Sequence, residues 1–293
     1  MAAILSNTKL NCHVRSISLP SLSGQEPEFI NLNRIQDSKE ASTSAPLMRG
    51  RLSQLNDMYG SIEPWLALPA TKSTSCVQRC NKEQLNKSLD EIVGLLDLCT
   101  TTKDVLSMSM DASKELQSVL RRKRGDHQNL ISLFKEYLSQ RKNVKKIVCK
   151  ALSGLEKQTS SSNKEDNKIT SDFNILKEMR FETLTMFESL LTFFLGSETE
   201  LKQKGWIFFS KMVGYKRVQC DQKHEESEVK KVDDVLRTII SFKNLKSGSL
   251  EVDTIQTGLA NLELQLLDLD QQVDRLSRNL IRNRVSILNF LNF

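Results

Sequence analysis

The sequence predicts an all-α protein, an elongated multi-helix bundle that ends in a long C-terminal helix. Of its 293 residues, 39% are hydrophobic and 27% are charged, but only 6% are aromatic, a composition typical of helical globular proteins. Eleven glycines and five prolines are too few for the many tight turns of an all-β fold. Apolar residues recur at alternating steps of three and four along most of the chain, which is the period of one helix face.

The first 46 residues are expected to form a disordered N-terminal tail, because they are rich in serine and lack a sustained apolar period. In this tail Arg15, Ser18 and Pro20 fit the R-S-x-S-x-P pattern that phosphoserine-binding 14-3-3 proteins read. A phosphate on Ser18 would add about −1.5 to −2 charge units and three acceptor oxygens. Ser18 is therefore the candidate phosphosite, and a chance match in a serine-rich tail is the alternative.

A helical domain is expected over residues 47–293. Its first helix is short and is expected to end near Pro64. A long second helix is expected from an N-cap at Asn81 to a stop at Gly125. The third is expected to run from there to a polar linker near residues 159–168. Arg141 fills the one polar position in the seam of this third helix.

Three shorter helices are expected between that linker and the last helix. The first is rich in phenylalanine and is expected to end at Gly196. Ser197 and Glu200 form a capping box that opens the next, which Gly214 closes. A polar linker near residues 215–228 leads to the third.

The last helix carries the strongest pattern in the chain. Its apolar residues keep a four-three rhythm from Ile255 to Phe290, interrupted only at Asn283. One flank of this seam holds no charge, whereas dimer zippers place charges there. A second apolar row lies across the helix and comprises Leu264, Leu267, Ile281, Val285 and Leu288. A helix that is apolar on two sides is expected to be surrounded, so we expect a bundle element with both rows buried rather than an exposed zipper.

Positive charge is concentrated in one stretch of the chain. The net charge is +6, but residues 121–150 contain ten basic residues against two acidic ones, a local charge of +8. The candidate basic patch comprises Arg121, Arg122, Lys123, Arg124, Lys142, Lys145, Lys146 and Lys150. Such a patch attracts nucleic acid or anionic membrane. In the alternative interpretation, the arginines complement the dipole of a helix end and the lysines form a solvated helix face.

No catalytic, cofactor or metal site is expected. The sequence lacks the phosphate-loop, dinucleotide, nucleophile-elbow and HExxH motifs. Its six cysteines include no CxxC pair and its three histidines are scattered, so zinc is not expected. No apolar run reaches the length of a membrane span. We therefore expect a non-enzymatic, reduced protein of the cytoplasm, with the nucleus or import into an organelle as alternatives.

Several strings, in order along the chain, resemble the plant-specific BYPASS-like family. They are residues 13–20, 96–99, 103–104, 120–126, Tyr137, 141–142, 145–146 and 280–289. The sequence departs from the family pattern after Pro20, where residues 24–27 read Gly-Gln-Glu-Pro. The resemblance implies an all-helical fold and a role in root and shoot development, with no assigned catalytic residues.

Together these observations predict a helical interaction or regulatory protein. We expect protein partners, among them a phosphoserine-binding adaptor that reads Ser18. Binding of anionic membrane or nucleic acid by the basic patch is the alternative function. The sequence leaves the oligomeric state open.

Overall fold

The computed structural model describes residues 44–67, 77–122, 127–162, 171–196, 227–241 and 248–292. Every regular element in these ranges is an α-helix, so the expected all-α fold is confirmed. The helices are α2 (Ala45–Ala67), α4 (Val77–Arg122), α5 (His127–Ser162), α6 (Ser171–Leu195), α9 (Glu228–Ser241) and α10 (Gly248–Asn292). The expected tail lies outside the described residues except for its last three positions, and so does the helix expected between Ser197 and Gly214.

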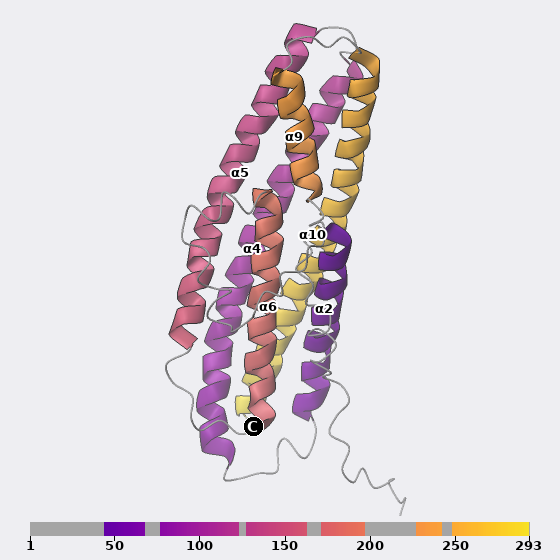
Figure 1. Cartoon of the computed structure of the whole chain (residues 1–293). Coiled ribbons are helices and arrows are strands. Elements are labelled where there is room, and N and C mark those ends of the chain that lie inside the picture. The colour runs from indigo at the N-terminus through magenta and orange to yellow at the C-terminus, as the bar shows by residue number, and fades with distance from the viewer. Residues whose placement is uncertain are drawn as a thin grey trace, which may run out of the picture.

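The helices form an elongated bundle in which α4 and α10 run nearly its full length, whereas α5 ends well above their lower ends (Figure 1). The shorter α6 and α9 follow one another along a single column, and α2 lies beside the lower half of α10. Helix α10 packs against α4, α2 and α9, whereas α5 packs against α4, α6 and α9. The long C-terminal helix is therefore a central element that holds both ends of the described chain together.

The seam of α10 is buried almost throughout, as its rhythm predicts. Its fully enclosed residues are Leu259, Leu262, Leu266, Leu269, Val273, Leu276, Leu280 and Ile287. Burial of each such side chain contributes about 1.5–3 kcal/mol. This helix is therefore the main apolar anchor of the bundle.

The second apolar row of α10 is exposed, so the expectation that both rows are buried is wrong. Leu264 is 64% exposed, Ile281 and Val285 are each 51% exposed, and Leu267 and Leu288 are also classed as exposed. Helices α4 and α2 pack against the two flanks of the seam. The side of α10 opposite the seam therefore faces outward, and none of the described helices covers it.

Two helix ends also differ from the sequence signals. Helix α2 continues through Pro64 to Ala67, because burial of Trp65 and Leu66 offsets the one backbone hydrogen bond that a proline removes. Helix α4 begins at Val77, before Asn81. Helix α6 ends where expected: Gly196 follows it with φ of 78°, a left-handed conformation that favours glycine.

Candidate interaction surfaces

The candidate phosphosite lies outside the described residues, together with Arg15 and Pro20. Lys123 and Arg124 of the basic patch also lie outside them. The phosphorylation of Ser18 therefore stays a prediction from the sequence.

Arg121 and Arg122 are exposed in the last turn of α4 and bind within their own helix. Arg121 Nη2 donates to Gln117 Oε1 at 3.2 Å. Arg122 Nε donates to the Ser118 carbonyl oxygen at 3.2 Å, a contact that suits a cation near the negative end of a helix. Together with Lys114 and Glu263, both arginines line a shallow surface hollow between α4 and α10. Three cations and one carboxylate make this hollow positive.

The lysines of the basic patch form a separate stripe along α5. Lys142, Lys146 and Lys150 are exposed at steps of four, and the exposed Lys135 lies on the same face. Lys145 is half-buried at the edge of this stripe. Lys142 is fifteen residues from the start of α5, or about 22 Å along its axis. The structure therefore places the arginines and the lysines apart along the bundle.

Arg141 is buried at the junction of α5, α6 and α9. Its Nε donates to Asp233 Oδ1 of α9 at 3.2 Å, and its Nη2 donates to the Phe194 carbonyl oxygen at the end of α6 at 2.7 Å. The guanidinium satisfies a terminal carbonyl of α6 and favours the negative end of that helix dipole. Its Nη1 has no hydrogen-bond partner within the described part of the chain. The polar position that interrupts the seam of α5 thus joins three helices.

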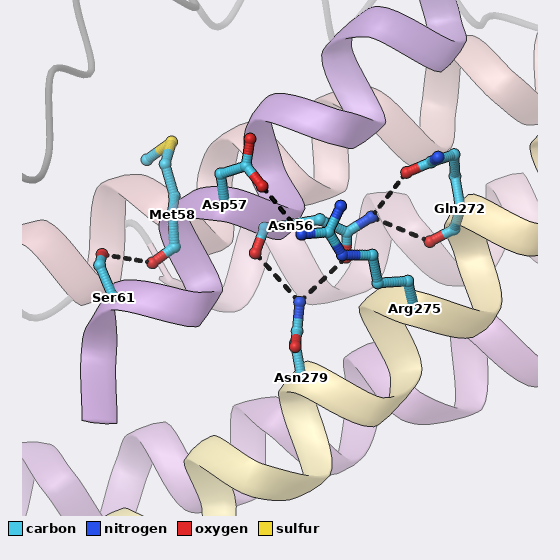
Figure 2. Close-up of polar contacts among 7 residues, drawn as sticks. All are labelled: Asn56, Asp57, Met58, Ser61, Gln272, Arg275 and Asn279. Carbon is cyan, nitrogen blue, oxygen red and sulfur yellow. Dashed lines mark hydrogen bonds and ion pairs between the residues drawn. The ribbon is translucent and has the colours of Figure 1, made fainter. Parts of the chain in front are cut away.

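A cluster of side-chain amides holds α2 against α10 (Figure 2). Asn56 Nδ2 donates to the carbonyl oxygen and to Oε1 of Gln272, both at 3.1 Å. Asn279 Nδ2 donates to the carbonyl oxygen of Asn56 at 3.0 Å and to its Oδ1 at 3.1 Å. A shift of α2 along α10 would leave these buried amides without partners, which is costly. The cluster therefore fixes the register between the two helices.

Two further contacts extend this cluster. Asn283 Nδ2 donates to the carbonyl oxygen of Tyr59 at 2.9 Å, so the interruption in the α10 seam is a satisfied polar contact. The Tyr59 hydroxyl forms a hydrogen bond with Thr183 Oγ1 of α6 at 2.9 Å. Only Asn283 can be identified from the sequence, where it interrupts the apolar seam, because Asn56 and Asn279 break no obvious apolar period.

Burial favours the neutral form of the Cys99 thiol and of the Tyr137 phenol. Burial raises the pKa of the Cys99 thiol to about 12 and that of the Tyr137 phenol to about 12.

Among the described residues, no group of three or more His, Cys, Asp or Glu side chains is placed to hold a metal ion. Within the same residues, no helix is long and apolar enough to cross a membrane.

The family model described as Protein BPS1 matches residues 51–290, from within α2 to near the end of α10. No curated protein and no solved structure matches the chain.

Proposed function

The chain belongs to the BYPASS family, described as Protein BPS1, and from this premise we propose that it is a non-enzymatic helical interaction protein. By resemblance to the family, it acts in plant root and shoot development, and we place it in the cytoplasm. Its partners are proteins, and Ser18 in the N-terminal tail regulates one of these contacts when phosphorylated.

The observation that carries this proposal is the exposed apolar row of α10, defined by Leu264, Leu267, Ile281, Val285 and Leu288. Single exposed apolar side chains are normal on a protein surface, whereas a row of them along one helix is typical of an interaction site. The row lies on the most extensively packed helix of the bundle, so it is presented by a rigid element.

The experiment is affinity purification from plant cells followed by mass spectrometry. We expect the wild-type chain to retrieve a stoichiometric protein partner and the double variant Leu264→Asp/Leu267→Asp to lose it, since a charge in an apolar contact is costly to desolvate. Asn261→Asp is the control for added negative charge, because it introduces one carboxylate, against two in the double variant, at an exposed position of the same helix. Equal retrieval by all three baits would contradict the proposed role of the row.

Ser18→Ala, tested in the same experiment, addresses the tail separately. If a phosphoserine-binding adaptor reads Ser18, this variant loses the adaptor and keeps the partners that bind α10. Identical sets of partners would show that the tail motif is a coincidence. Turnover of a small molecule by the purified chain would contradict the non-enzymatic assignment.

The lysine stripe of α5 supports a second candidate function, binding to an anionic membrane surface or to nucleic acid. Lys135, Lys142, Lys146 and Lys150 present four positive charges on one exposed face. Each lysine near an anionic membrane contributes about 1 kcal/mol. We expect Lys142→Glu/Lys146→Glu/Lys150→Glu to abolish sedimentation with phosphatidylserine vesicles or retention on DNA, and Arg121→Glu/Arg122→Glu to have a smaller effect. Binding that is unchanged in the triple variant would exclude the stripe.

A further inference from the structure

The outer surface where α4 and α10 lie side by side has a defined register. Lys103 Nζ of α4 lies 2.6 Å from Asp274 Oδ1 of α10, and Gln117 Nε2 lies 3.2 Å from Glu263 Oε2. The two helices are antiparallel, because the α10 number falls as the α4 number rises. Asp97 is six residues before Lys103 and twenty before Gln117 on α4. Counted the same distances forward from Asp274 and Glu263, it lies at the height of residues 280–283 of α10.

The α4 flank of this surface is acidic. Asp90, Asp97, Asp104 and Asp111 recur at steps of seven and all are exposed, so they form one row along the helix. None of the four forms an ion pair with another described residue. The row therefore leaves negative charge uncompensated on the outside of the bundle.

The α10 flank at the lower end of the same surface is basic. Arg278 and Arg282, four residues apart on one face of the helix, are exposed there. Arg278 is paired with Asp274 on its own helix, whereas Arg282 forms no ion pair with the described residues. By the register of the two helices, Arg282 lies at the height of Asp97.

Apolar side chains separate the two charged flanks. Ile281 and Val285 are each 51% exposed, and Leu288 and Val93 are each 39% exposed. Val93 lies ten residues before Lys103 on α4, and because the helices are antiparallel this corresponds to a position ten residues after Asp274 on α10. Val93 therefore lies at the level of Ile281, Val285 and Leu288. Across its width the surface is therefore acidic on α4, apolar in the middle and basic on α10.

We propose that this lower α4–α10 surface binds a second copy of the chain, related by a two-fold axis parallel to the helices. Such a rotation places the acidic α4 flank of each copy against the basic α10 flank of the other, at equal height, and brings the apolar strips together. A surface of this kind is self-complementary, as a two-fold interface requires. The inference deepens the proposed interaction function by naming one partner of the α10 row.

The proposed interface is small. Residues 274–292 span about 27 Å of α10, and two adjacent helices are about 20 Å wide, so each copy buries on the order of 500 Å². The total is at the low end for specific complexes. The dimer is therefore reversible, and its ion pairs make it weaker as the salt concentration rises.

Sedimentation equilibrium of the purified full chain tests the proposal. We expect the apparent mass to rise from that of one chain, 33.4 kDa, towards that of two as the concentration increases. Asp97→Arg and Arg282→Asp each place like charges together at both symmetric contacts, so each variant is expected to be monomeric. An equimolar mixture of the two is expected to restore the dimer, because opposite charges then meet at both contacts.

Asp111→Arg is the matched control. Asp111 belongs to the same acidic row, but residues 266–269 lie at its height and include Asp268 rather than an arginine. This variant is expected to dimerise at least as well as the wild type. Val285→Asp provides a second break through the apolar strip, with circular dichroism to verify that the helices are intact.

Three outcomes would overturn the proposal: a wild-type chain that stays monomeric at all concentrations, a dimer that survives both charge reversals, or a mixture that fails to recover. The measurement uses the purified chain alone, so a monomeric result leaves the retrieval of other proteins by Leu264 and Leu267 as a separate question. Failure of self-association and failure of the proposed function are thus distinguishable.

Discussion

Both faces of α10 carry a row of apolar residues, but the structure treats the two rows differently. The inward face buries a continuous seam and pairs its amides, so that Leu276 is fully enclosed and Asn279 binds Asn56. The outward face also carries apolar residues, but Leu264 is 64% exposed and Val285 is 51% exposed. Periodicity therefore shows which positions are apolar and does not show what covers them. In this bundle the inward row packs in the core, whereas the outward row is exposed and can contact other proteins.

The largest difference in the free energy of unfolding between an inward and an outward residue is expected on α5, where the cationic residues Arg141 and Lys142 are adjacent. Arg141→Met removes the partner of the buried Asp233 carboxylate and should lower the free energy of unfolding by about 3–5 kcal/mol. Lys142→Met alters an exposed side chain and should change it by less than about 0.5 kcal/mol. Urea unfolding of both variants measures the difference. Equal effects would show that the ion pair does not hold the α5–α6–α9 junction.

An intermediate difference is expected for two asparagines of α10. Asn279→Ala leaves the Asn56 carbonyl oxygen and Oδ1 with one donor fewer inside the bundle, which should cost about 1–3 kcal/mol. Asn289→Ala changes an exposed residue of the same type and should be nearly neutral. Thermal unfolding compares the two, and a neutral Asn279→Ala would show that the amide cluster does not determine the position of α2.

The smallest effect is expected at the border between the two faces, where Lys103 binds Asp274. The hydrogen bond to Asp274 raises the pKa of Lys103, and the same hydrogen bond lowers the pKa of Asp274. The contribution of the pair is therefore present at neutral pH, is lost as the pH falls through the lowered pKa of Asp274, and is lost again as the pH rises through the raised pKa of Lys103.

Both side chains are more than a third exposed, so the pair should contribute no more than about 1 kcal/mol. Lys103→Met is expected to lose this amount in urea unfolding at pH 7. Below the pKa of Asp274 the variant and the wild type should become equally stable. A difference that persists in acid would assign the effect to packing of the lysine stem.

Much of the fold was predictable from local patterns. The seam of α10 and the end of α6 at Gly196 follow from periodicity and from one glycine in a left-handed conformation. Arg141 was visible as a polar residue in an apolar seam, but its partner Asp233 was not, because the two are 92 residues apart. The amides Asn56 and Asn279 are 223 residues apart, and no local pattern links them.

The candidate surfaces were predictable only in part. The basic residues were identified from their density, yet density along the chain does not show that the arginines end α4 while the lysines run along α5. The exposure of the second α10 row was predicted wrongly. Coverage of a helix face depends on how many neighbours pack around it, and here α2 and α4 pack against the flanks of the seam and leave the opposite side open.

The most direct test of this division between the two faces is the stability of a matched pair of variants on α10. Leu276→Ala should lower the free energy of unfolding by about 2–5 kcal/mol, because it opens a cavity in the buried seam. Leu264→Ala should change it by less than about 0.5 kcal/mol, because its side chain is already 64% exposed. Urea unfolding of both variants measures the contrast. A loss at Leu264 as large as that at Leu276 would show that the second row is buried within the chain, and would contradict its assignment as an interaction surface.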